Sequence, residues 1–120
     1  MSKKKSKRKS TRITLHVDLD EHNVPERITW AADDQAGAEP QECKAILLAL
    51  FDKANKETLK IDLWTKDMQV IEMDRFFFQS LRSMADTYFK ATQNTALAKD
   101  MQRFVQYFGE KTEIIPKSKS

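Results

Sequence analysis

The chain has 120 residues, of which 40% are hydrophobic and 32% charged, the composition of a globular protein with one modest core. Its net charge of +3 is unevenly distributed, because Lys3–Arg12 is strongly basic whereas Ile13–Ser120 carries 14 Lys and Arg against 18 Asp and Glu. With only two glycines, the chain excludes phosphate-binding loops and dinucleotide fingerprints, which need several glycines close together.

The first eleven residues are rich in Lys and Ser and contain no apolar residue after Met1, so we expect a disordered basic tail over residues 1–11. A solubilising extension is the favoured interpretation of this tail. Binding of nucleic acid or an anionic membrane through Lys3–Arg12 is the weaker alternative, because the rest of the chain is acidic. Residues 12–113 are expected to form a single α+β domain, followed by a polar C-terminal tail over residues 114–120.

The first regular element is a strand. Apolar and polar residues alternate strictly over Ile13–Leu19, which predicts a half-buried strand. Turn-forming residues over Asp20–Glu26 and renewed alternation over residues 28–32 predict a hairpin. We expect a loop over Asp33–Glu42.

The next two segments are predicted to form a second hairpin. Ala45–Phe51 is apolar throughout and suits either a strand or a short buried helix; its length of seven residues favours the strand. Thr58–Trp64 alternates again, and its Trp64 falls on the face of Lys60 and Asp62, opposite the aliphatic side chains. The polar residues Thr65, Lys66 and Asp67 follow directly.

The period then changes to that of helices. Apolar residues recur at three- and four-residue steps from Met73 to Tyr88, which predicts a helix of about five turns. Asn94 or Thr95 can cap a second helix, and Gly109 is expected to mark its end. The fold class is therefore α+β: an antiparallel sheet of about four strands followed by two C-terminal helices packed on one face.

Aromatic residues are abundant in the predicted helices. Phe76–Phe78 are consecutive and span about 200° of a helix circumference, so one buried stripe cannot hold all three. We expect Phe78 on a second, outward apolar face that serves self-association or a protein partner. The remaining large apolar residues of the expected core are Phe77, Leu81, Met84, Phe104 and Phe108.

The residue types exclude most catalytic and metal chemistry. One cysteine and two histidines lack the spacing of zinc sites, and the single cysteine excludes an intrachain disulfide. The segment Asp18–Thr29 begins like a calcium loop, but it has Asn23 where Gly is required and Thr29 where Glu is required. We therefore expect no enzyme, catalytic residue, cofactor or metal. No apolar run is long enough to cross a membrane, so we expect a cytoplasmic protein.

Four residues remain as candidate contacts for a protein partner: Trp64, Lys66, Asp67 and Phe78. An aromatic residue on the polar face of a strand, beside a cation and an anion, is typical of interfaces. Covering the start of the following helix is the alternative role of Trp64.

Three segments resemble the gliding motility protein GldC family of Bacteroidetes: HVDLDEHNVPERITWAA, KAILLALFDKANKETLKIDLWTKDM and EMDRFFFQSLRSMADTYFKAT. The likeness runs from about Ile13 to about Lys111 and leaves out the basic tail. It implies a small cytoplasmic accessory protein of the gliding machinery, which these bacteria couple to a dedicated secretion system. The resemblance carries over no catalytic residue and no cofactor.

The leading hypothesis is a non-enzymatic accessory or adaptor protein that binds protein partners of the gliding and secretion machinery and that can self-associate. The alternative is a holdase-like chaperone for secreted or motility proteins, because four antiparallel strands followed by two helices resemble the export chaperone SecB. This second hypothesis rests on topology alone, and fold does not determine function.

Overall fold

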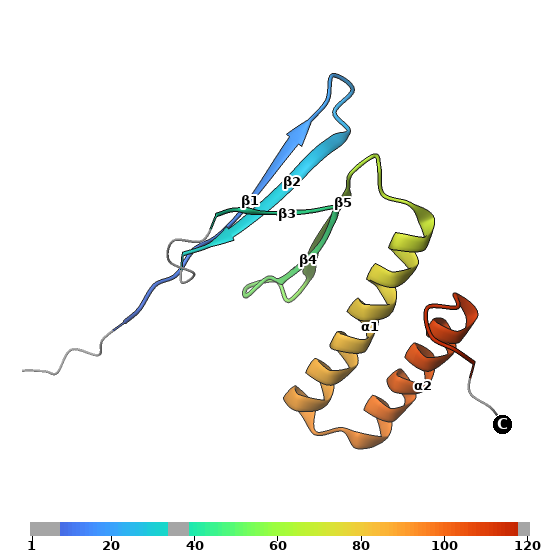
Figure 1. Cartoon of the computed structure of the whole chain (residues 1–120). Coiled ribbons are helices and arrows are strands. Elements are labelled where there is room, and N and C mark those ends of the chain that lie inside the picture. Colours follow the sequence, from blue (N-terminus) through green and yellow to red (C-terminus); the bar gives the residue numbers. More distant parts are fainter. Residues whose placement is uncertain (1–7, 34–38, 118–120) are drawn as a thin grey trace, which may run out of the picture. The chain divides into compact units, whose positions relative to one another are not determined.

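The computed structural model describes residues 8–33 and 39–117. Their contacts divide into two compact units, residues 1–68 and residues 69–120, which we call the strand unit and the helical unit (Figure 1). All the strands of the described residues lie in the first unit and both helices in the second, which confirms the α+β class. The expected basic tail falls mostly on residues 1–7, outside the described residues. The single domain over residues 12–113 and the packing of the helices on one face of the sheet stay predictions.

The first sheet contains the predicted N-terminal hairpin. Its strands pair antiparallel in the order β1 (Ile13–Leu19), β2 (Pro25–Ala32), β3 (Gln41–Cys43). In the register, Leu15 lies opposite Trp30 and Val17 opposite Ile28, so the apolar residues of the two strands share one face. Ile28 is fully buried and is the centre of this face.

The second sheet is a hairpin of β4 (Ala45–Phe51) and β5 (Thr58–Trp64), so Ala45–Phe51 is a strand, as favoured. The Asp52 carboxylate accepts the backbone N–H groups of Ala54 (3.0 Å) and Asn55 (2.9 Å) and closes the turn. One face is wholly aliphatic, with the pairs Ile46–Leu63, Leu48–Ile61 and Leu50–Leu59. The other face pairs Ala45 with Trp64, Leu47 with Asp62, Ala49 with Lys60 and Phe51 with Thr58.

The strand count and the sheet differ from the prediction of one sheet with about four strands. The described residues form five strands in two sheets. The additional strand, β3, overlaps the end of the predicted loop Asp33–Glu42. β3 and β4 follow one another with a bend at Lys44, and β3 pairs with β2 whereas β4 pairs with β5. A strand of three residues is too short to show alternation, which is why the sequence pattern did not reveal it.

The helical unit contains α1 (Val70–Thr92) and α2 (Thr95–Lys111). α1 starts three residues before Met73, where the backbone N–H of Gln69 donates to the Glu72 carboxylate at 2.9 Å. Of the two predicted candidates, Asn94 caps α2: its side-chain oxygen accepts the Leu97 N–H at 3.0 Å. Gly109 does not end α2, however. It is buried within the helix, and a Cβ atom there would lie 2.6 Å from Cε1 of Phe78.

The contact between the helices is made largely by small residues. Ala85 of α1 and Ala98 and Gly109 of α2 are buried, together with Phe78 and Val105. The predicted core was therefore wrong for three of its large residues: Phe77, Met84 and Phe104 are exposed. The prediction assumed that the largest apolar residues face the other helix. In the structure, small residues occupy much of that contact, because they let the two helices approach closely.

Candidate functional site

The motif that follows β5 connects the two sheets of the strand unit. The backbone N–H of Thr65 donates to the carbonyl oxygen of Lys44 at 2.8 Å, where the chain bends between β3 and β4. The next N–H, that of Lys66, donates to the carbonyl oxygen of Pro25 at 3.2 Å, at the start of β2. Thr65 is only 3% exposed. We call this region the junction, and it consists of Asp20, Pro25, Glu26, Lys44, Thr65, Lys66 and Asp67.

The side chain of Lys66 fixes the turn of the β1–β2 hairpin. Its Nζ atom lies 2.8 Å from Oδ2 of Asp20, 46 residues earlier in the chain, and 3.6 Å from Oε2 of Glu26. The hydrogen bond from Lys66, followed by those from the backbone N–H groups of Val24 and His22, lowers the pKa of Asp20 to about 2. The same hydrogen bond raises the pKa of Lys66. The pair therefore stays charged over the physiological pH range.

Asp67 also interacts within the junction. The Thr65 hydroxyl donates to Oδ1 of Asp67 at 2.5 Å, and this bond, with the nearby Lys44, lowers the pKa of the carboxyl group. The Nζ atom of Lys44 lies 4.0 Å from Oδ2 of Asp67. Lys66 and Asp67, two of the four residues predicted to contact a partner, thus both make side-chain interactions within the strand unit.

A small polar hollow of about 240 Å³ opens beside the junction and is lined by Glu26, Glu42, Cys43, Lys44, Thr65 and Asp67. Burial raises the pKa of the Cys43 thiol, so it is a weaker nucleophile at neutral pH than an ordinary cysteine. Within the residues that the structure describes, no group of three or more His, Cys, Asp or Glu side chains could hold a metal ion. This hollow therefore offers no support for nucleophilic or metal chemistry.

Trp64 differs from its neighbours in the motif. It lies on the expected face of the hairpin, opposite Ala45, and 52% of its surface is exposed. Leu47 and Phe51 lie on the same face of β4 and are also exposed. The exposed apolar side chains of this face have Trp64 near one end and Phe51 at the other, with the ion pair of Lys60 and Asp62 between them. We call this face of the hairpin the tryptophan face.

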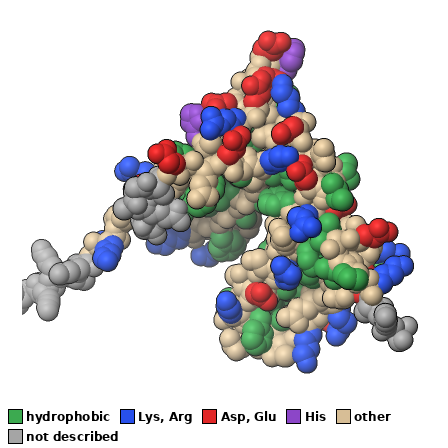
Figure 2. Space-filling model, in the orientation of Figure 1, with side chains coloured by type: hydrophobic (Ala, Val, Ile, Leu, Met, Phe, Trp, Pro, Cys, Tyr) green, Lys and Arg blue, Asp and Glu red, His purple; other side chains and the backbone are tan. Residues whose placement is uncertain are grey.

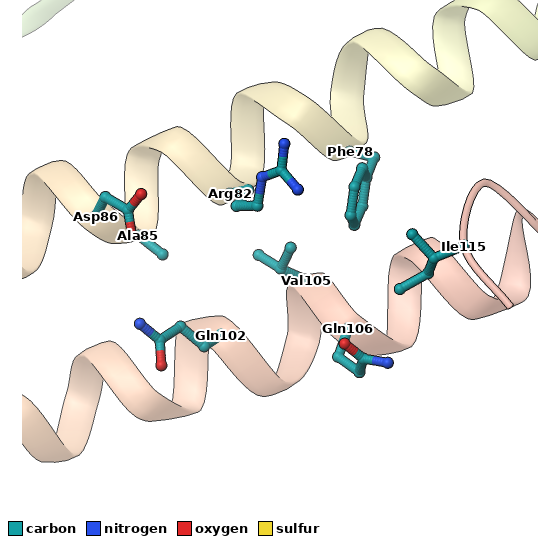
Figure 3. Close-up of a pocket in the computed structure, with 8 residues that line it drawn as sticks. All are labelled: Phe78, Arg82, Ala85, Asp86, Gln102, Val105, Gln106 and Ile115. Atoms are coloured by element: carbon teal, nitrogen blue, oxygen red, sulfur yellow. The ribbon is translucent and has the colours of Figure 1, made fainter. Parts of the chain in front are cut away.

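Phe78 does not lie on an outward face, which corrects the expectation. Its ring is 5% exposed and points between α1 and α2, with the Arg82 guanidinium carbon 5.1 Å from the ring centroid (Figure 3). A cavity of about 380 Å³ beside it is lined by Phe78, Arg82, Ala85, Asp86, Gln102, Val105, Gln106 and Ile115. Half of the lining is apolar, from Phe78, Ala85, Val105 and Ile115, and the other half carries amide or charged groups.

The structure brings together three of the four predicted contacts, Trp64, Lys66 and Asp67, because they are consecutive or nearly so in the chain. Two residues that matter as much were missed. Thr65 stands in the polar cluster after Thr58–Trp64, and Asp20 begins the predicted turn Asp20–Glu26, but neither is among the predicted contacts. No pattern in the sequence indicates that Asp20 meets Lys66, because the contact depends on how the two sheets meet.

A family model described as gliding motility-associated protein GldC-like matches residues 25–114, three quarters of the chain. Neither the curated proteins nor the solved structures contain a match. Neither of the described helices is long and apolar enough to cross a membrane.

Proposed function

The chain belongs to the GldC-like family of gliding motility-associated proteins, and we propose that it is a non-enzymatic adaptor that acts in the cytoplasm by binding a protein of that machinery. The observation that carries this proposal is the tryptophan face. Trp64 and Phe51 are 52% and 68% exposed on one side of a two-stranded sheet. Large aromatic residues at the centre of a contact supply much of the binding energy in protein complexes.

The junction supports this assignment because it fixes the position of Trp64. The residue that follows it, Thr65, is buried and hydrogen-bonded to Lys44, and Lys66 is tied to Asp20 and to Pro25. A rigid scaffold reduces the entropy that is lost when an exposed aromatic residue docks. Lys66 and Asp67 therefore act as positioning residues, and Trp64 is the proposed contact.

The test is complementation of a gliding strain that lacks its own copy of the gene. We expect Trp64→Ala to abolish or strongly reduce spreading. The matched control is Leu59→Ala on the same strand, because Leu59 has similar exposure, 58%, but lies on the opposite face. Both variants should unfold at nearly the wild-type temperature. Equal rescue by the two variants would contradict the proposal, and so would recovery of every cross-linked partner by Trp64→Ala.

A second candidate function is that of a holdase-like chaperone. It is favoured by the exposed apolar residues on both faces of the β4–β5 hairpin, Phe51 on one and Leu59 on the other. A chaperone should suppress the aggregation of unrelated unfolded proteins, and Trp64→Ala and Leu59→Ala should weaken this suppression to similar extents. An adaptor should show no such suppression and should be sensitive to Trp64→Ala alone.

A further inference from the structure

β1 has a backbone edge that pairs with nothing else in the described part of the chain. It pairs with β2 alone, and it runs for seven residues, ITLHVDL, without proline or lysine. Natural edge strands commonly carry such residues because they prevent pairing with another chain. The edge of β1 is therefore open to a further strand.

The hydrogen-bond pattern shows which backbone groups point outward. The ladder to β2 continues beyond both ends of β1, since Asp33 N–H donates to the carbonyl of Arg12 (3.0 Å) and Asp20 N–H donates to that of Val24 (2.9 Å). Even-numbered residues of β1 thus direct their backbone groups toward β2. Successive residues of an antiparallel strand alternate in this respect, so Leu15 and its odd-numbered neighbours direct theirs outward.

The charges along this strand are opposite at its two ends. Arg8, Lys9 and Arg12 lead into β1, whereas Asp18 and Glu21 lie at its other end, and all of them are exposed. Figure 2 shows acidic side chains and a histidine gathered around the turn that follows β1. Two copies of such a strand attract each other when they run antiparallel, because each basic end then meets an acidic end.

We propose that β1 is a self-association edge, on which two copies of this chain pair antiparallel about a two-fold axis at Leu15. Leu15 then lies opposite Leu15 of the second copy, Ile13 opposite its Val17, and Arg12 opposite its Asp18. The outward N–H and C=O groups of the odd-numbered residues pair with each other. The apolar faces of both copies join without interruption, and so do the polar faces.

The charges favour this register over the two neighbouring ones with the same face pattern. Moving the two-fold axis to Thr14 would place Arg12 opposite His16 instead of a carboxylate. Moving it to His16 would place Arg12 opposite Asp20, whose carboxylate already accepts from Lys66 at 2.8 Å. It would also place His16 opposite itself. The Asp18 carboxylate lies 2.9 Å from Nε2 of His16 on the same strand, but its side chain is 54% exposed, whereas that of Asp20 is 10% exposed. Arg27, which lies across from Asp18 within the chain, is already paired with Glu42 at 3.8 Å.

The β4–β5 hairpin has two further long open edges in the described part of the chain. β4 carries no charged side chain, and β5 has a weaker charge argument than β1. Its two charged side chains, Lys60 and Asp62, form an ion pair with each other on the same strand. They therefore offer less attraction to a second copy than the separated charges of β1.

The first test is the oligomeric state of the full chain, measured by sedimentation at about 50 mM and about 500 mM salt. We expect a dimer at low salt that weakens at high salt, because exposed charges are screened. Leu15→Pro removes only an outward donor and keeps the ladder to β2. It should raise the dissociation constant by roughly thirtyfold, the effect of losing two symmetric hydrogen bonds. Leu15→Ala keeps the donor and should raise it less than about fivefold. A monomer at about 100 μM and low salt would overturn the proposal, and so would a dimer unaffected by Leu15→Pro.

The second test is charge reversal. Arg12→Asp and Asp18→Arg should each weaken the dimer by at least about fivefold, and the double variant should restore it. The two positions are about 20 Å apart along one strand, so a rescue cannot arise within one chain. Circular dichroism and thermal unfolding show whether each variant remains folded. Failure of the double variant to regain association, with its fold intact, would refute this register.

Discussion

Gly109 makes a sharp prediction, because two opposing effects on stability can be compared. Replacing a helical glycine by alanine stabilises a helix by up to about 1 kcal/mol. At Gly109, however, the new Cβ atom would lie 2.6 Å from Cε1 of Phe78 and 2.8 Å from Cγ1 of Ile115. Both distances are shorter than real carbon contacts, so these side chains must move.

The cost of that movement decides the sign. Inserting a methyl group into a packed core costs about 1–3 kcal/mol. The Phe78 ring is 5% exposed and has the Arg82 guanidinium over it, so a shift of the ring must use part of the cavity beside it and disturb this packing. We therefore expect Gly109→Ala to lower the free energy of unfolding of the helical unit by about 1 kcal/mol, the difference between overpacking at about 2 and helix propensity at about 1.

The assay is urea unfolding followed by two probes. Far-UV circular dichroism reports mainly the helices, whereas fluorescence reports the strand unit, because both tryptophans, Trp30 and Trp64, lie there. Only the helical transition should shift. In a Phe78→Leu background, which removes the ring edge and leaves the contact with Ile115, the same Gly109→Ala change should cost less. A Gly109→Ala chain that is more stable than the wild type would refute the reasoning.

Two further predictions concern the α2 cap and the junction. Asn94→Ala should destabilise the helical unit by about 1 kcal/mol, measured by the same dichroism transition. Asn94→Asp should retain most of the cap, because it keeps a side-chain oxygen at this position. Equal losses of stability in the two variants would show that the side-chain oxygen does not matter. The pH dependence of the strand unit should follow the Asp20–Lys66 pair. The folded pKa of Asp20, about 2, lies below its ordinary value of 3.8, so its contribution is complete above pH 3.8 and is lost as the pH falls through 2. The pKa of Lys66 is raised, so its contribution is complete below pH 10.5 and is lost as the pH rises through the raised value. Urea midpoints by tryptophan fluorescence should therefore differ between wild type and Asp20→Asn at pH 7 and converge near pH 2; a constant difference would contradict the ion-pair assignment.

Local patterns predicted most of the secondary structure. Strict alternation identified β1 over Ile13–Leu19, and the short apolar run Ala45–Phe51 proved to be a strand. Residue type alone narrowed the cap of α2 to Asn94 or Thr95, and the structure has it at Asn94. These features depend on a few neighbouring residues, which is why one sequence is enough to find them.

Features of the fold that depend on contacts between distant segments of the chain could not be predicted from the sequence. The bend at Lys44 divides one expected sheet into two, because β3 and β4 choose different partners. The helical pattern alone does not show which of the three consecutive phenylalanines faces the other helix. Phe78 is the one that packs closely against Gly109 of α2. The contact of Asp20 with Lys66 joins residues 46 positions apart.

The junction also determines how a variant of Trp64 can be interpreted. The hydrogen bonds that connect the sheets come from the backbone of Thr65 and Lys66 and from the side chains of Lys66 and Asp20. None of them involves the indole of Trp64, which is half exposed. Replacing it by alanine therefore removes apolar surface and leaves these connections in place. Lys66→Ala, by contrast, would release the hairpin turn as well as a charge. A loss of motility in Trp64→Ala with an unchanged unfolding temperature would thus report a lost contact, whereas the same loss in Lys66→Ala would not distinguish contact from scaffold.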